Sequence, residues 1–456
     1  MFFHEDEQQS LEKIYNKDGA DLVIIYGRRR LGKTTLVLKS LEGKDGAYLY
    51  TPRGNIEDIV TYYLSSLRNQ INLQLVGKIT EFREFLELLG VIAKNRKVLI
   101  ILDEFQRIHE ADEKAISLLQ DYWDRVLKRT QIKLILVGSI VGLIEKLAIK
   151  GDAPLFGRKT LELKIRPLPF YRVHRFWNML DFEEKITAYG IFGGTPAYID
   201  MFNKKLSLWE NVLQLIIRKD SPLNNEPDSL LSAEVRSSTT YMAILNKISE
   251  GRRGLPLGKI KVGNVNVIPY IRTLEKMDII ERLYSLGEKK RGALYVFKDE
   301  FFRFWFRFIN KNYWLIEMER YNLVIDEIKK NINEYLSFTS EKILRELLIL
   351  YSGKVLFGKR IPKFTKFGPF FERGVEVDAL GVNKDIIVVG EIKWKNEKLG
   401  LKDISKVIEK TEYLAKKLKR KKYLTIIVSK SGFKQHYEEE NILLIDLNML
   451  QQAFGQ

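Results

Sequence analysis

The chain of 456 residues contains no cysteine. This absence excludes disulfide bonds, thiolate nucleophiles, cysteine-ligated zinc sites and iron–sulfur clusters. Histidine is also scarce, because the chain has only four. A histidine-rich metal site is therefore not expected either.

Long hydrophobic runs are missing as well. Although 45% of the residues are hydrophobic, no stretch approaches the ~18–20 uninterrupted apolar residues of a membrane span. The N-terminal segment carries Glu5, Asp6 and Glu7, where a secretory signal would carry basic residues and then an apolar segment. We therefore expect a cytoplasmic protein with no membrane partner.

Positive charge is in excess, since 76 lysines and arginines face 59 acidic residues and the net charge is +17. Such a balance favours a polyanionic partner, because each phosphate contact releases counterions. DNA is the partner we expect. Solubility conferred by lysine is the alternative explanation.

A glycine-containing loop follows the apolar run Leu22–Tyr26 and matches the phosphate-binding pattern G-x-x-x-x-G-K-[ST]. Its backbone N–H groups would surround the β-phosphate, Lys33 would bridge the β- and γ-phosphates, and the Thr34 hydroxyl would hold Mg²⁺. Because backbone N–H groups would bind the phosphates, the side chains of Arg28, Arg29 and Arg30 are expected to face solvent or a partner. The expected ATP-binding residues are Gly27, Arg28, Arg29, Arg30, Leu31, Gly32, Lys33, Thr34, Thr35, Asp103 and Ser139.

Apolar runs alternate with amphipathic segments up to residue 168, which is typical of parallel strands covered by helices. The length exceeds the ~250–300 residues of a single core, so we expect about two to four domains. Helices are predicted at Ile56–Asn69, Ile79–Asn95 and Ala111–Lys128. Strands are predicted at Leu22–Tyr26, Ala47–Thr51, Val98–Asp103, Lys133–Gly138 and Thr160–Ile165. The prediction is an α/β fold with a doubly wound parallel sheet.

The third predicted strand ends in Asp103-Glu104. Asp103 would hold Mg²⁺ through water, and Glu104 would orient and deprotonate the attacking water, so the pair predicts hydrolysis. Ser139 would contact the γ-phosphate or the water, or else cap a helix over Ile140–Leu147. Arg158, just before the fifth strand, would reach the γ-phosphate as a finger.

Four segments together resemble the archaeal ATPase family, a STAND-like branch of the AAA+-related P-loop ATPases. They are His4-Glu5-Asp6-Glu7, the loop Gly27–Thr34, Leu102-Asp103-Glu104-Phe105 and Arg166-Pro167-Leu168. The resemblance covers roughly the first half of the chain and implies ATP and Mg²⁺ as cofactors. That family usually has arginine at the position of His4.

The middle of the chain is predicted to be mostly helical. Residues 169–235 would form a helical lid, with turn-forming residues at 193–196. Residues 236–300 would form a winged helix, with helices at Thr240–Ser249, from Lys259 onward and at Val265–Met277, and a hairpin of Ile279–Leu286 and Leu294–Phe297. Residues 301–330 would form a linker helix, whose many aromatic residues predict a buried core element rather than a flavin or base platform.

The last segment, residues 331–456, places two carboxylates and a lysine close together. A hairpin of strands Gly374–Gly381 and Ile386–Glu391 would bring Asp378 beside Glu391, with Lys393 on the same face as Glu391. Such a set binds Mg²⁺ and supports phosphodiester hydrolysis. A helix Ile332–Ser352 would precede it, and helix Leu401–Leu418 and strands Lys422–Ser429 and Ile442–Asp446 would follow.

This segment resembles the PD-(D/E)XK nuclease fold, the restriction-endonuclease-like α/β domain, and the uncharacterised domain fused to archaeal ATPases. The resemblance implies metal-ligand and catalytic roles for Asp378 and Glu391, a catalytic role for Lys393, and a fourth member at Glu341 or, alternatively, Glu346. An inactive nuclease fold with salt-bridged carboxylates is the other interpretation.

Clusters of cations accompany the two DNA-compatible segments. They comprise Lys354, Lys359, Arg360, Lys363 and Lys366; Lys416, Lys417, Lys419, Arg420, Lys421 and Lys422; Arg252, Arg253, Lys259 and Lys261; and Lys289, Lys290 and Arg291. The main hypothesis is an ATP-driven switch or motor that controls a DNA-binding and DNA-cutting C-terminal domain. The alternatives are a back half that only binds protein or DNA, and a STAND-type signalling protein that forms homo-oligomers.

Overall fold

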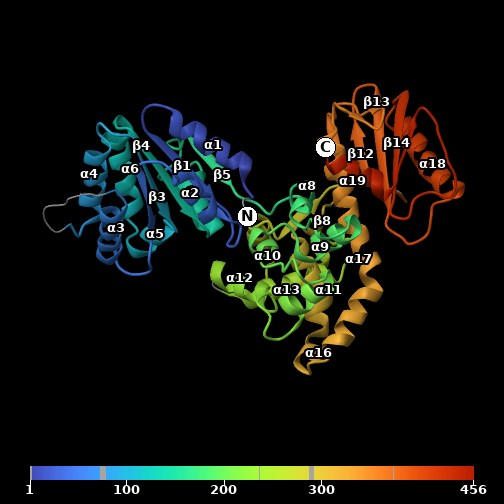
Figure 1. Cartoon of the computed structure of the whole chain (residues 1–456), viewed down its shortest axis with the longest axis horizontal. Coiled ribbons are helices and arrows are strands. Elements are labelled where there is room, and N and C mark those ends of the chain that lie inside the picture. Colours follow the sequence, from blue (N-terminus) through green and yellow to red (C-terminus); the bar gives the residue numbers. More distant parts are fainter. Residues whose placement is uncertain (1–2, 72–78, 236, 287–291, 373, 456) are drawn as a thin grey trace. The chain divides into compact units, whose positions relative to one another are not determined.

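The computed structural model describes residues 3–71, 79–235, 237–286, 292–372 and 374–455. The chain divides into two units, residues 1–167 and 168–456 (Figure 1). The boundary between them lies one residue from the end predicted for the ATPase domain. The four segments predicted beyond it all lie in the second unit.

The first unit is built on a parallel sheet with the strand order β2-β3-β4-β1-β5. Its strands are β1 (Asp21–Tyr26), β2 (Gly46–Tyr50), β3 (Val98–Asp103), β4 (Ile132–Gly138) and β5 (Leu161–Lys164). All residues of β1, β3 and β4 are buried, as expected when both faces of a sheet are covered. The predicted α/β fold with five parallel strands is confirmed.

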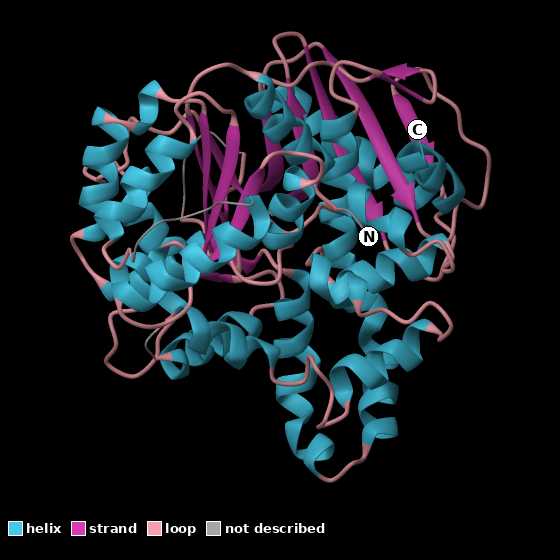
Figure 2. Cartoon of the chain, turned by 60° about the vertical axis from the view of Figure 1, so that its left-hand side comes forward, coloured by secondary structure: helices cyan, strands magenta, loops and turns pink. Residues whose placement is uncertain are grey.

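Helices cover both faces of this sheet (Figure 2). Alternate residues of β1 pack into two separate cores, with Leu22 and Ile24 in one and Val23 and Ile25 in the other. The helices are α1 (Glu5–Asn16), α2 (Lys33–Leu41), α3 (Ile56–Ile71), α4 (Phe82–Ile92), α5 (Gln106–Ala111), α6 (Ala115–Arg125) and α7 (Val141–Ile144).

The helix predicted at Ala111–Lys128 is present as α6 over Ala115–Arg125, but its predicted start is wrong. Asp112 has an extended backbone, and its carboxylate accepts a hydrogen bond from the Lys114 amide at 2.9 Å. This local turn ends α5 and starts α6, because aspartate competes with the helix for backbone donors.

The second unit begins with short helices: α8 (Phe170–Val173), α9 (Phe182–Phe192), α10 (Pro196–Asp200), α11 (Leu208–Val212) and α12 (Glu226–Glu234). The predicted aromatic segment follows the pattern of a core element, with α15 (Glu300–Phe304), a π-helical turn Trp305–Ile309 and α16 (Tyr313–Glu317). Phe301, Phe302, Phe304 and Trp305 are buried, whereas Trp314 is 59% exposed.

Between these helices lie α13 (Ser238–Ser249), β6 (Leu255–Pro256), α14 (Ile268–Lys276), β7 (Ile280–Leu283) and β8 (Leu294–Phe297), with the three strands in the order β6-β8-β7. The helix predicted from Lys259 onward is wrong, because only a 3-10 turn, Leu257–Lys259, is present. Gly258, Gly263 and the β-branched valines nearby disfavour a longer helix. The predicted wing cations Lys289, Lys290 and Arg291 lie outside the described residues.

The C-terminal part combines the long helix α17 (Tyr321–Leu350) with a mixed sheet in the order β11-β12-β13-β14-β15. Its strands are β11 (Lys366–Glu372), β12 (Val375–Val382), β13 (Ile386–Lys393), β14 (Lys422–Ser429) and β15 (Ile442–Ile445). Helices α18 (Leu401–Lys417) and α19 (Leu447–Gly455) and a small hairpin of β9 (Val355–Leu356) and β10 (Lys359–Arg360) complete it.

Edge strand β11 was not predicted. It contains Gly368-Pro369, which is typical of a turn, and its register shifts between Gly368 and Phe370. The antiparallel pairing of β12 with β13 agrees with the predicted hairpin. Among all helices of the described residues, none is long and apolar enough to cross a bilayer.

Candidate functional site

The phosphate loop connects β1 to α2 at the carboxyl edge of the first sheet. Gly27 has φ 156°, and a Cβ there would lie 2.3 Å from the Ile165 carbonyl oxygen, so a side chain is excluded. Gly32 precedes α2 in the left-handed region with φ 77°. The loop therefore exposes backbone N–H groups at the start of a helix, the geometry that binds phosphate.

Lys33 reaches back across this loop. Its ammonium group donates to the carbonyl oxygens of Gly27 at 2.7 Å and Arg28 at 2.9 Å. The side chain is nearly buried. This position holds the cation over the turn, where it can pair with phosphate oxygens.

Arg28 differs from expectation, because it is 1% exposed and does not face solvent. Arg29 and Arg30 are half-buried. Arg30 has φ 67°, so the loop backbone bends sharply at this residue. The loop thus buries one of its three arginines.

Thr34 and Asp103 lie side by side, because β3 runs beside β4, which pairs with β1. The Thr34 hydroxyl donates to Asp103 Oδ2 at 2.9 Å, and the Tyr48 hydroxyl donates to the same oxygen at 2.7 Å. Two oxygen donors this close can share one Mg²⁺, as the sequence predicts. Burial and the hydrogen bond to Asp103 raise the pKa of Tyr48, which therefore stays a donor.

Glu104 is the residue predicted to act as base. Its backbone has φ 55°, and its carboxylate accepts hydrogen bonds from Gln106 and, at 2.7 Å, from the Ser139 hydroxyl. Ser139 does not cap the following helix, which begins at Val141 with Ile140 before it. Of the two roles considered for Ser139, the cap is not made, and its hydroxyl instead binds Glu104.

Arg158 is not at the phosphate loop. It precedes β5, whose Leu161 pairs with Val23 of β1, so it lies at the amino edge of a parallel sheet whose carboxyl edge carries the loop. Its guanidinium binds Asp124 Oδ2 at 2.7 and 3.0 Å. The prediction of an arginine finger acting within the same chain is wrong, because strand direction sends the residue to the opposite edge.

Three residues near the loop were missed or left without a role by the sequence. The buried His4 places Nε2 2.6 Å from the Leu31 carbonyl oxygen, so it supports the loop. Tyr48 and Gln106 contact Asp103 and Glu104. No spacing rule links Tyr48 to Asp103, because only the strand order brings β2 beside β3, whereas Gln106 lies two residues from Glu104.

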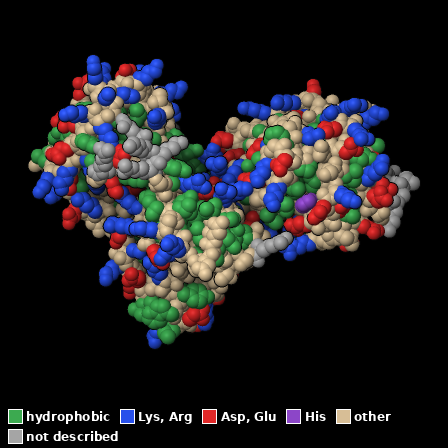
Figure 3. All heavy atoms as spheres, turned by 180° about the vertical axis from the view of Figure 1, so that it is seen from behind, with side chains coloured by type: hydrophobic (Ala, Val, Ile, Leu, Met, Phe, Trp, Pro, Cys, Tyr) green, Lys and Arg blue, Asp and Glu red, His purple; other side chains and the backbone are tan. Residues whose placement is uncertain are grey.

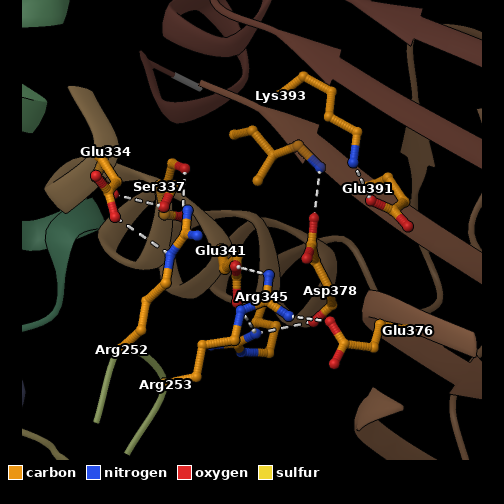
Figure 4. A network of polar contacts seen from close by, with 12 residues as sticks. Arg252, Arg253, Glu334, Ser337, Glu341, Arg345, Glu376, Asp378, Glu391 and Lys393 are labelled. Atoms are coloured by element: carbon orange, nitrogen blue, oxygen red, sulfur yellow. Dashed lines mark hydrogen bonds and ion pairs between the residues drawn. The ribbon is translucent and has the colours of Figure 1, made fainter. Parts of the chain in front are cut away.

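A second group of charged residues lies in the second unit, where β12, β13 and α17 meet (Figure 4). The Asp378 carboxylate accepts a hydrogen bond from the Ile392 amide at 2.8 Å. Lys393 donates to Glu391 Oε2 at 2.6 Å, and Lys410 of α18 donates to Glu391 Oε1 at 2.7 Å. Asp378, Glu391 and Lys393 therefore gather as predicted, with Lys410 as an addition that the sequence did not reveal.

Glu341 belongs to this group and Glu346 does not. Glu341 accepts a hydrogen bond from Arg253 at 2.9 Å and lies 3.9 Å from Arg345. Glu346 instead accepts a hydrogen bond from the Tyr171 amide at 3.3 Å. The structure thereby separates the two alternatives that the sequence left open.

Burial raises the pKa of the Asp378 carboxyl to about 8, and the charges of Glu341 and Glu391 add to the effect. Burial also raises the pKa of Glu341. Such shifts cluster at functional sites. Within the described part of the chain, no three histidine, aspartate or glutamate side chains converge to hold a metal ion.

The lysine and arginine side chains of the C-terminal part are only partly available to contact DNA phosphates. Lys359 donates to the carbonyl oxygens of Glu439 and Glu440, Lys417 binds Glu372, and Arg420 donates to the Asn383 carbonyl oxygen. Lysine and arginine side chains are spread among acidic ones over the visible face (Figure 3). The predicted clusters are therefore surface features mixed with internal ion pairs.

Two family models match the chain. Residues 3–202 match an ATPase domain predominantly from Archaea, and residues 305–407 match a family described as archaeal and bacterial proteins of unknown function. An uncharacterized protein of Methanocaldococcus jannaschii is 33% identical over 414 residues, which cover 88% of this chain and 89% of that protein. A second uncharacterized protein of the same organism is 27% identical over 168 residues, 36% of this chain and 29% of that protein.

Among solved structures, the Walker-type ATPase PABY2304 of Pyrococcus abyssi is similar, with a TM-score of 0.49 and 19% identity over 67% of this chain and 96% of that one. The ORC2 protein of Aeropyrum pernix, solved in ADPNP and ADP complexes, has a TM-score of 0.47 and 16% identity over 70% of this chain and 95% of that one.

Proposed function

The chain belongs to the archaeal ATPase family, and we propose that it binds ATP with Mg²⁺, hydrolyses it, and uses the nucleotide state to control a DNA-binding and DNA-cleaving C-terminal part. One observation carries the first half of this proposal. Glu104, fixed by Ser139 and Gln106, directly follows Asp103, which pairs with Thr34. The residues that we assign as metal ligands and base thus lie next to the phosphate loop.

The residues have separate tasks in this proposal. Thr34 and Asp103 would hold Mg²⁺, which neutralises charge on the phosphates when bound. Lys33 pairs with the β- and γ-phosphates. Glu104 takes the proton from the attacking water, and the hydrogen bonds from Ser139 and Gln106 keep its carboxylate in one orientation.

The second half of the proposal rests on the group around Asp378. Two carboxylates and a lysine on two paired strands are the chemistry that metal-assisted phosphodiester hydrolysis requires. We propose that the α13–β8 segment is a winged helix. It would bind DNA, with α14 as its recognition helix. The basic net charge supports a polyanionic partner.

One experiment tests both halves. Wild type, Lys33→Ala and Asp378→Ala are incubated with plasmid and Mg²⁺ or Mn²⁺, with and without ATP, while phosphate release is recorded. We expect phosphate release to be lost in Lys33→Ala, and plasmid cleavage to be lost in Asp378→Ala with phosphate release retained. Cleavage that persists in Asp378→Ala contradicts the nuclease assignment, and cleavage that ignores both ATP and Lys33→Ala contradicts the control by nucleotide.

A second candidate function is a STAND-type ATPase switch whose C-terminal part binds a protein or DNA partner without cutting it. The observation in its favour is that Glu391 and Glu341 are already engaged by Lys393, Lys410 and Arg253. For this function we expect no plasmid cleavage by any variant. A separate filter assay would show ATP-dependent retention of DNA.

A further inference from the structure

The second unit contains a cavity of about 180 Å³ between the loop after α13, strand β8 and helix α17. A single water needs only ~10–15 Å³ on this measure, so the cavity has room for a small ligand group. Four arginines line it: Arg252, Arg253, Arg303 and Arg307. Phe297, Tyr335 and Phe338 form its aromatic wall.

The lining carries more positive than negative charge. Its two carboxylates are Glu250 and Glu334, and Glu334 lies 3.4 Å from Arg252. Arg303 is balanced from outside the lining by Glu300, at 2.6 Å. Arg307 has no carboxylate within ion-pair distance among the residues that the structure describes. An anion entering the cavity would therefore meet the unpaired charge of Arg307.

The cavity is also held rigid. The Arg303 guanidinium donates to the Tyr335 carbonyl oxygen at 3.1 Å and lies 3.8 Å from the centre of the Tyr335 ring. Gly254 has φ 86°, and a Cβ there would lie 2.4 Å from the Tyr295 carbonyl oxygen, so the loop that carries Arg252 and Arg253 is fixed against β8. Groups held in place before a ligand arrives lose little entropy on binding.

We propose that this cavity binds a phosphate group. Planar guanidinium groups match phosphate oxygens with paired hydrogen bonds. The aromatic wall offers a stacking surface for a base attached to the phosphate. The phosphate belongs either to a free nucleotide or to a nucleic-acid backbone.

Arg253 connects the cavity to the carboxylate group. Figure 4 shows Arg252 and Arg253 reaching from their loop toward α17, and Arg253 binds Glu341 at 2.9 Å and Glu376 at 2.5 Å. A phosphate in the cavity competes for this guanidinium and so weakens its hold on Glu341. The consequence, a carboxylate group freed to take a divalent cation, rests on the proposed function, whereas phosphate binding itself does not.

The test uses the full-length chain with Lys33→Ala, which weakens the phosphate loop. Inorganic pyrophosphate and a short single-stranded oligonucleotide are titrated separately by calorimetry at low salt. The same titrations are repeated after adding Arg307→Glu, or Arg320→Glu as the control. Arg320 is exposed and does not line the cavity, and its substitution makes the same change of charge.

We expect Arg307→Glu to weaken binding of at least one probe about tenfold or more, since a hydrogen bond to a charged group is lost, and Arg320→Glu to leave it within about twofold. Loss of pyrophosphate binding assigns a free phosphate ligand, and loss for the oligonucleotide alone assigns a backbone phosphate. If Arg307→Glu unfolds, Arg307→Gln replaces it. Equal affinities in the cavity and control variants for both probes, or no binding at all, overturn the proposal.

A separate readout addresses the link through Arg253. Binding of Mn²⁺ is measured by electron paramagnetic resonance with and without the probe that binds. We expect the probe to increase Mn²⁺ binding in the Lys33→Ala chain and to have no such effect when Arg253→Ala is added. Mn²⁺ binding that is the same with and without the probe contradicts the link, while the phosphate site stands on calorimetry.

Discussion

Glu346 shows how the surroundings of one side chain set its chemistry. It lies on α17 and accepts a hydrogen bond from the Tyr171 amide at 3.3 Å. Burial raises the pKa of its carboxyl from 4.5 to about 8. The folded protein therefore binds the proton of Glu346 more tightly than the unfolded chain does.

This shift predicts a pH dependence of stability. Because the folded pKa is raised, the contribution of Glu346 is fully present below pH 4.5 and is lost as the pH rises to about 8. The lost free energy of unfolding is about 3–5 kcal/mol. Glu346→Gln, which mimics the protonated form, should lose this part of the dependence and be more stable than wild type at pH 8.5.

Denaturant unfolding at pH 5 and pH 8.5 measures this difference. The exposed Glu409→Gln is the control, and it should follow the wild-type pH dependence. If Glu346→Gln loses as much stability as wild type between the two pH values, the buried carboxyl is not the cause.

At the residue scale the sequence predicted what local spacing encodes. Lys33, Thr34, Asp103 and Glu104 could be recognised because each sits at a fixed distance from a buried strand. Tyr48, Lys410 and Arg253 could not, because their partners come from elements that only the folded topology brings close.

At the scale of elements, strands were easier to predict than helix ends. The central strands β1, β3 and β4 are fully buried and largely apolar, as a doubly covered parallel sheet requires. The break at Asp112 and the short turn Leu257–Lys259 depend on single hydrogen bonds and glycines. The edge strand β11 was hidden by Gly368-Pro369, residues that an edge strand tolerates.

The segment from α13 to β8 carries an element-scale prediction about DNA. Lys259 and Lys261 are exposed beside the 3-10 turn that precedes α14. If they contact phosphates, Lys259→Ala and Lys261→Ala should each weaken DNA binding and reduce the slope of log affinity against log salt by about 1.

Fluorescence anisotropy with a labelled duplex at several salt concentrations measures this slope. The exposed Lys204→Ala is the control and should leave both affinity and slope unchanged. An unaltered slope in both test variants would mean that these lysines touch no phosphate.

At the scale of the whole molecule, the sequence predicted five segments where the structure has two units. The difference arises because the later segments share their interiors. The Tyr335 hydroxyl of α17 donates to the Gly190 carbonyl oxygen of α9 at 2.7 Å, and the Phe170 ring meets the Phe454 ring of α19 at 5.3 Å. Segments that pack into one another behave as one unit, whatever their individual patterns suggest.

The division into two units separates the two proposed sites. The phosphate loop and Glu104 lie in the first unit, and Asp378, Glu391 and Arg253 lie in the second. Hydrolysis in one unit can act on the other only if the ATP-bound chain differs from the ADP-bound chain in its affinity for DNA. The plasmid experiment tests whether plasmid cleavage depends on ATP, but hydrolysis itself comes first.

The most direct test of the account is ATP turnover by full-length Glu104→Gln, with ATP affinity measured on the same preparation. Because Glu104 is placed as the base and Lys33, Thr34 and Asp103 remain intact, we expect ATP affinity within about threefold of wild type and turnover lowered about 100-fold or more. Near-normal turnover by Glu104→Gln would contradict the assignment of the base and, with it, the proposed hydrolytic site.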